Sequence, residues 1–131
     1  MKGYKSNSNV VFRCKFHVIF CPKYRRKVLQ DGVDVRLKEI IAGCAEDFKF
    51  DVDAIEVMPD HVHLLIDCDP QYGIHKIVKG VKGRSSKLLR EEFPTLKSRL
   101  PTLWTNSYFV VTCGGAPLET IKKYIEDQKH H

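Results

Sequence analysis

The chain has 131 residues, of which 43% are hydrophobic and 29% charged, a composition typical of one globular domain spanning residues 1–131. No apolar run is long enough to cross a membrane, and the start MKGYKSNSN lacks the apolar core of a secretory signal. We therefore expect a cytoplasmic protein with no membrane partner. The five scattered cysteines form no CxxC pair, which argues against a disulfide framework or a zinc knuckle. The net charge of +6 favours a polyanionic partner.

The first half of the chain predicts a strand, a helix and a pair of strands. Apolar and polar residues alternate over 10–20, which indicates a strand with one apolar and one partly basic face. Apolar residues over 33–48 follow helical spacing. Two more strands are expected at 51–57 and 61–67, and the turn-forming residues Pro59-Asp60 connect them.

The second half predicts a helix, a strand and a final helix. Residues 74–89 place apolar side chains on one helix face and lysines and arginines on the opposite face. A strand is expected at 108–112, the glycines at 114–115 end it, and a last helix runs from about Pro117 to Gln128. The order βαββαβ predicts an α+β, ferredoxin-like (RRM-like) sandwich, with both main helices on one face of an antiparallel sheet and a C-terminal helix added.

The stretch MPDHVHLLI, residues 58–66, contains two histidines on a predicted strand. Val62 and its alternate neighbours face the helices, so His61 and His63 emerge together on the open face of the sheet. Their side chains would be close enough to share one metal ion, because neutral imidazoles are common metal ligands. The alternative is two half-exposed histidines without a role. Asp60 or Asp67 could orient an imidazole, although a turn residue and a strand-end charge are simpler explanations.

The last predicted helix, PLETIKKYIEDQ, carries a second pair of polar side chains. Tyr124 and Gln128 are four residues apart, so they share one side of the helix, one turn from each other. Spacing alone leaves open a simpler explanation, in which Tyr124 is an aromatic residue at the edge of the core and Gln128 is a solvated end residue.

The ordered set of motifs resembles a known family along nearly the whole chain. The segments that show this resemblance are VIFCPKYRRKVL (18–29), MPDHVHLLI (58–66), LWTNSYFV (103–110) and GGAPLETIKKYIEDQ (114–128). They are similar to the single-tyrosine transposases of the insertion-sequence 200/605 group, also called IS200-like transposases. These belong to the HUH nucleases, whose name refers to a His-hydrophobic-His motif.

This resemblance implies a metal-dependent tyrosine transferase that acts on single-stranded DNA. His61, His63 and Gln128 would bind one divalent ion, and Tyr124 would be the catalytic nucleophile. Two imidazoles suit zinc or another transition metal on ligand preference alone, whereas the family points to Mg²⁺ or Mn²⁺, which we expect here. Cleavage would give a covalent 5′-phosphotyrosine and a free 3′-OH. Because that linkage keeps the phosphodiester energy, strands can be rejoined without a nucleotide cofactor.

The partners follow from the resemblance as well. The expected substrate is single-stranded DNA with an imperfect hairpin near each end of an insertion sequence. Family members are homodimers whose active sites combine the histidines of one subunit with the tyrosine helix of the other. The Gly114-Gly115 break is compatible with docking of the last helix on its own subunit or on a partner, and the sequence does not decide between them.

Basic and aromatic residues supply candidate DNA contacts, for which the alternative is an ordinary solvated surface. The candidate basic residues are Arg13, Lys15, Lys23, Arg25, Arg26, Lys79, Lys82, Arg84 and Lys87. Tyr24, Tyr72, Trp104 and Tyr108 could stack on unpaired bases, although Trp104 and Tyr108 fit a core equally well.

Three other functions remain open from the sequence. A domesticated relative could nick hairpins in chromosomal repeats with the same chemistry. A non-catalytic RRM-like module could bind nucleic acid on the open sheet, although RRM domains place aromatic residues where His61 and His63 lie. A small metal-binding regulatory protein would need neither Tyr124 nor the basic surface.

Overall fold

The computed structural model describes residues 5–6, 11–12, 14–112 and 118–130. Two features singled out in the sequence, Arg13 and the Gly114-Gly115 break, lie outside the described residues. Within the described part of the chain, no helix has the length and apolarity needed to cross a membrane.

The centre of the molecule is a four-stranded antiparallel sheet with the order β4-β5-β3-β6. Its strands are β3 (Lys15–Phe20), β4 (Asp51–Met58), β5 (His61–Asp67) and β6 (Phe109–Thr112). In this order β3 lies between β5 and β6 and pairs antiparallel with both.

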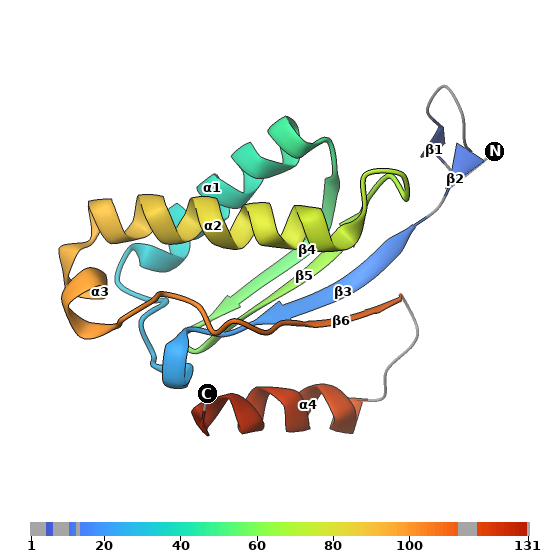
Figure 1. Cartoon of the computed structure of the whole chain (residues 1–131). Helices are drawn as coiled ribbons and strands as arrows, with labels where there is room; N and C mark the ends of the chain where they lie inside the picture. Colours follow the sequence, from blue (N-terminus) through green and yellow to red (C-terminus); the bar gives the residue numbers. More distant parts are fainter. Residues whose placement is uncertain (1–4, 7–10, 13, 113–117, 131) are drawn as a thin grey trace.

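Two long helices, α1 (Val33–Phe48) and α2 (Ile74–Glu92), cover one face of this sheet (Figure 1). This arrangement confirms the predicted α+β sandwich. The last helix, α4 (Leu118–Asp127), lies on the opposite side of the sheet and continues into the short 3-10 helix η2 (Gln128–His130).

Several short elements were not predicted, and the first predicted strand is shorter in the main sheet than expected. Lys5–Ser6 (β1) pairs with Val11–Phe12 (β2) in a separate two-stranded sheet, so the strand predicted over 10–20 joins the main sheet only from Lys15. Helix α3 covers Pro94–Arg99, and a 3-10 turn, η1, covers Lys23–Arg25. Elements this short carry too few residues for a hydrophobic period to be recognised.

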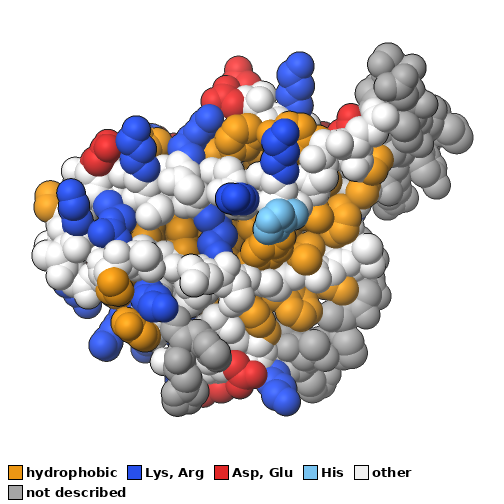
Figure 2. Space-filling model, viewed as in Figure 1, with side chains coloured by type: hydrophobic (Ala, Val, Ile, Leu, Met, Phe, Trp, Pro, Cys, Tyr) orange, Lys and Arg blue, Asp and Glu red, His pale blue; other side chains and the backbone are white. Residues whose placement is uncertain are grey.

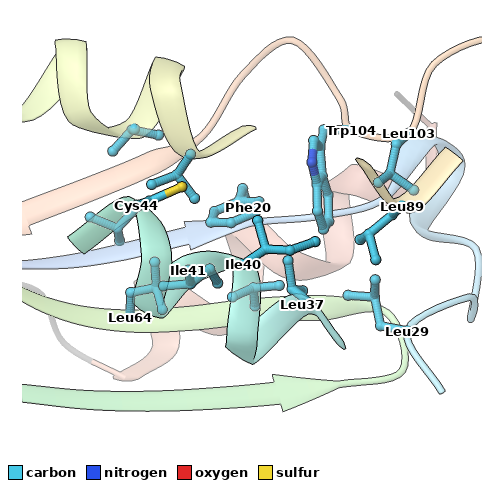
Figure 3. Close-up of a cluster of buried hydrophobic side chains, with 14 of the residues drawn as sticks. Phe20, Leu29, Leu37, Ile40, Ile41, Cys44, Leu64, Leu89, Leu103 and Trp104 are labelled. Atoms are coloured by element: carbon cyan, nitrogen blue, oxygen red, sulfur yellow. The ribbon is translucent and has the colours of Figure 1, made fainter. Parts of the chain in front are cut away.

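The core lies between the sheet and helices α1 and α2, where the alternating strand residues meet the apolar helix faces (Figure 3). Val62, Leu64 and Ile66 are at most 1% exposed, as their alternation predicts. Trp104 belongs to this core rather than to a DNA surface. Its ring packs edge-on against Phe20 at 4.7 Å, and its indole N–H donates to the Ser85 hydroxyl at 3.0 Å.

The second face of the sheet is also partly covered. Ile19 faces away from α1 and α2, because it alternates with the core residues Val18 and Phe20, yet it is 0% exposed. Helix α4 lies on this side of the sheet (Figure 1), which accounts for the burial. The face that carries the histidines therefore forms an interface with the last helix.

Candidate active site

His61 and His63 lie on β5 directly after a tight turn that joins it to β4, where Met58 pairs with His61. Both imidazoles are partly buried on the sheet face opposite to Val62 and Leu64. The face predicted for them is therefore confirmed.

His61 is held by a carboxylate in the preceding turn. Its Nδ1–H donates to Asp60 Oδ1 at 2.9 Å, and the other carboxylate oxygen of Asp60 pairs with Nε of Arg25 at 2.8 Å. This contact fixes the orientation of the ring and favours the tautomer whose Nε2 can accept a metal ion. Asp60, one of the two aspartates considered from the sequence, therefore contacts an imidazole.

His63 lies beside a third histidine, from β3. Its Nε2 is 3.0 Å from Nδ1 of His17, and the ring centroids are 5.2 Å apart. Burial lowers the pKa of His63, and the neighbouring His17 lowers it further. Both effects disfavour the imidazolium form, so His63 is kept neutral, as metal binding requires.

Tyr124 and Gln128 are brought together by one hydroxyl group. The Ser107 hydroxyl, just before β6, lies 3.5 Å from the Tyr124 hydroxyl and 3.5 Å from Oε1 of Gln128. Gln128 is only 4% exposed, so it is not the solvated end residue that spacing alone allowed. Burial raises the pKa of Tyr124 to about 12, although the hydrogen bond with Ser107 lowers it slightly. The phenol is thus protonated at neutral pH.

The strand register places the tyrosine on the same sheet face as the histidines. Ile19 on β3 pairs with His63 on one side and with Phe109 on the other, so these three side chains form one row across the sheet. The Tyr124 ring packs against Phe109 with centroids 5.4 Å apart. The row spans two strand spacings, about 10 Å.

Arg25 links the histidine strand to the tyrosine helix. Residues Tyr24 and Arg25 adopt left-handed backbone angles, with φ of 59° and 52°, in the tight turn η1. Besides Asp60, the Arg25 guanidinium donates to Glu126 Oε2 at 2.9 Å and to the backbone carbonyl of Ile125 at 3.3 Å. A continuous set of polar contacts therefore runs from His61 through Asp60 and Arg25 to α4.

Comparison with known proteins identifies the family. Residues 10–128 match the family model described as Transposase IS200 like. The chain belongs to the IS200-like transposase family. Transposases cut and rejoin DNA, so this chain, called the transposase below, is a DNA-processing enzyme.

Individual relatives agree with this assignment. The transposase is 39% identical over 126 residues to the ISDra2 transposase TnpA of Deinococcus radiodurans, covering 95% of this chain and 90% of the relative. It is 29% identical over 126 residues to the transposase for insertion sequence element IS200 of Salmonella typhimurium, with coverage of 95% and 82%.

Two solved structures share the fold. One, from Deinococcus radiodurans and described as a candidate transposase, has a TM-score of 0.84 at 38% identity and covers 95% of this chain and 97% of its own. The other is a REP-associated tyrosine transposase bound to a REP hairpin, with a TM-score of 0.58 at 13% identity and coverage of 93% and 68%. At that identity the second match shows similarity of fold alone.

The donor chemistry of the transposase suits a divalent ion. Across residues 14–112 and 118–130, no group of three or more His, Cys, Asp or Glu side chains is arranged so that it could bind a metal ion by itself. A metal site on His61 and His63 would therefore need another type of donor, and the side-chain amide oxygen of the buried Gln128 is of a suitable type. Two neutral imidazoles and one amide leave room for phosphate or water ligands.

The structure separates the predicted DNA-binding residues of the transposase into two groups. Four have internal partners: Lys15 pairs with Asp53 at 2.7 Å, Arg84 with Asp47 at 2.6 Å, Arg25 with Asp60, and Lys82 with backbone carbonyls. In the second group, no carboxylate in the described part of the chain pairs with the basic side chain. This group consists of Lys23, Arg26, Lys79 and Lys87.

Sequence reasoning missed Ser107, and it considered Lys82 only as a candidate DNA contact. Ser107 joins Tyr124 to Gln128, and Lys82 holds the segment before β6 by donating to the carbonyls of Thr105, Asn106 and Ser107 at 2.6, 3.3 and 3.1 Å. Burial lowers the pKa of Lys82 to about 8. Lys82 lies on the basic face of α2, between the buried residues Val81 and Ser85, but spacing does not reveal which carbonyls it reaches.

Proposed function

We propose that this transposase cleaves and rejoins single-stranded DNA at insertion-sequence ends through a covalent 5′-phosphotyrosine intermediate on Tyr124. One observation carries the proposal. The hydroxyl of Ser107 lies 3.5 Å from the side chains of both Tyr124 and Gln128. The helix that carries Tyr124 packs against the sheet face on which His61 and His63 lie.

The proposed roles follow from the chemistry of each side chain. His61, His63 and Gln128 would hold a divalent ion, Mg²⁺ or Mn²⁺. When bound, this ion would polarise a phosphoryl oxygen of the DNA as a Lewis acid. Asp60 keeps His61 in the tautomer that offers Nε2, and His17 lies against His63.

Tyr124 performs the transfer in this proposal. Its phenol oxygen loses a proton and attacks phosphorus, the P–O3′ bond breaks, and the 3′ oxygen leaves with a proton as a free hydroxyl. A later 3′-OH attacks the phosphotyrosine and restores the phenol, so no nucleotide cofactor is consumed. Because the pKa of Tyr124 is about 12 in this structure, substrate and ion must favour the phenolate for fast cleavage.

The proposed partners are single-stranded DNA with hairpin ends and a second copy of the chain. A REP hairpin is the ligand of the structural neighbour named above. Lys23 and Arg26, which pair with no carboxylate among the described residues, suit contacts with phosphates. The homodimer, in which active sites combine residues of two subunits, rests on the family resemblance. So does a cytoplasmic, nucleoid-associated location.

A denaturing gel tests this function. The protein is mixed with single-stranded oligonucleotides carrying the ends of its own genetic element, with Mg²⁺, Mn²⁺ or a chelator. We expect a covalent protein–DNA band that requires metal and is absent in Tyr124→Phe and His61→Ala. As a matched control, Tyr24→Phe removes another tyrosine hydroxyl but keeps the ring, and it should still form the band. Tight hairpin binding without any covalent band would reject the transferase in favour of a non-catalytic DNA-binding relative.

A further inference from the structure

A hollow outside the candidate active site opens between α2 and the segment that precedes β6. Its volume is about 320 Å³, and its lining residues are His75, Lys79, Lys82, Asn106 and Tyr108. This volume lies within the usual range for small-ligand sites, about 300–1,000 Å³.

The hollow has an aromatic wall. The His75 and Tyr108 rings are nearly parallel, with an interplanar angle of 22° and centroids 5.9 Å apart. A 2.7 Å hydrogen bond between Nδ1 of His75 and the Tyr108 hydroxyl holds the pair together. His75 is exposed and Tyr108 is partly buried, so the pair offers flat surface to the outside while one ring is anchored.

The charge of the hollow is positive. None of the described residues that line it is acidic, and none of the described carboxylates pairs with Lys79, which is exposed. Figure 2 shows Lys and Arg side chains gathered over α2 beside an exposed histidine. An aromatic wall next to an unpaired cation is the combination that binds unpaired bases and their phosphates.

The hollow lies next to the candidate active site, on the other side of one chain segment. Ser107 turns toward α4 and contacts Tyr124, whereas its neighbour Tyr108 turns toward α2 and contacts His75. Lys82 joins the two places, because it donates to the Ser107 carbonyl and lies 5.8 Å from the centre of the Tyr108 ring. A strand bound at Tyr124 would reach the hollow by crossing the β6 edge of the sheet.

We propose that this hollow binds one nucleotide of the single-stranded substrate, close to the phosphodiester that is cleaved. The base stacks on the His75–Tyr108 pair, and the Lys79 ammonium contacts a phosphate. This subsite rests on the proposed function, since it takes its ligand from the same DNA strand. Stacking accepts any base, so the subsite contributes affinity and positions the strand rather than reading sequence.

Binding measurements in the Tyr124→Phe background test the subsite without consuming DNA. The probes are end-derived single-stranded oligonucleotides in which one position at a time is made abasic. We expect one position near the cleavage site where base removal weakens binding about tenfold, a typical loss for one stacked base. In the variant that combines His75→Ala and Lys79→Ala, the same removal should weaken binding less than twofold. Lys38→Ala, an exposed α1 lysine, is the charge-matched control and should keep the full tenfold penalty.

A base analogue provides a second measurement that a purely structural defect would not reproduce. Fluorescent 2-aminopurine at the identified position should be quenched on binding, and quenching should be lost in His75→Ala. If no abasic position weakens binding, or if the penalty persists without His75 and Lys79, the subsite is wrong. The covalent protein–DNA band of the wild-type protein is measured separately. If the abasic penalty is absent but the band forms, only the subsite is rejected. If the penalty is present but no band forms, only the transferase activity is rejected.

Discussion

Replacing Arg25 with alanine removes the link between the histidine strand and the tyrosine helix. The change deletes the 2.8 Å contact to Asp60, the 2.9 Å contact to Glu126 and the 3.3 Å contact to the Ile125 carbonyl. The Arg25 and Asp60 side chains are each only 15% exposed, whereas Glu126 is 62% exposed. Most of the loss should therefore come from the Asp60 contact, because solvent screens the pair with Glu126.

The expected magnitude follows from the Asp60 contact. A hydrogen bond between charged groups contributes about 1.5–3 kcal/mol, and about 1.4 kcal/mol corresponds to a factor of ten. We therefore expect Arg25→Ala to slow covalent-complex formation in a single turnover by about ten- to hundredfold. Hydrogen exchange should become faster in α4, because the helix loses its anchor on η1.

Two variants act as controls for the Arg25 experiment. Arg25→Lys keeps the positive charge but cannot contact Asp60 and α4 with one planar group, so it should restore only part of the rate. Arg36→Ala removes another Arg–Glu pair, with Glu92 at the surface, and should leave the rate unchanged. If Arg25→Ala cleaves within twofold of the wild type while α4 exchange is unaltered, the proposed link between the two parts of the site is wrong.

Three further changes probe the residues around Tyr124. Burial raises the pKa of Tyr124 to about 12, so the phenolate fraction grows with pH. The single-turnover rate of cleavage should therefore rise about tenfold per pH unit from neutral pH to about pH 9. A rate that does not change with pH would show that proton loss from Tyr124 does not limit cleavage. Ser107→Ala removes the hydroxyl shared with Gln128 and should slow cleavage about three- to tenfold, while circular dichroism stays unchanged; a wild-type rate would exclude a positioning role. Lys82→Met leaves three backbone carbonyls without their donor and should lower the free energy of unfolding by about 1–3 kcal/mol. Calorimetry should show this loss as a melting temperature several degrees lower. An unchanged melting temperature would mean that water replaces the ammonium group without loss of stability.

Features that depend on local periodicity could be predicted from the order of the residues alone. Alternation over 61–67 fixed which face of β5 carries His61 and His63, because successive strand side chains point to opposite sides. The four-residue spacing of Tyr124 and Gln128 fixed their common helix side. The βαββαβ order of the main elements followed from the same patterns, and the preference for short connections then favoured an antiparallel sandwich.

Contacts between side chains that are distant in the sequence could be found only in the folded chain. Ser107 reaches Tyr124 across 17 positions, and Arg25 reaches Glu126 across 101. No hydrophobic period encodes such pairs, because they depend on how α4 and the segment before β6 pack on the sheet. Packing likewise left Lys79 without a carboxylate partner in the described chain and buried Lys82 against backbone carbonyls, although both lie on the basic face of α2. Charge is a property of the sequence, but its availability to DNA depends on what each side chain touches after folding.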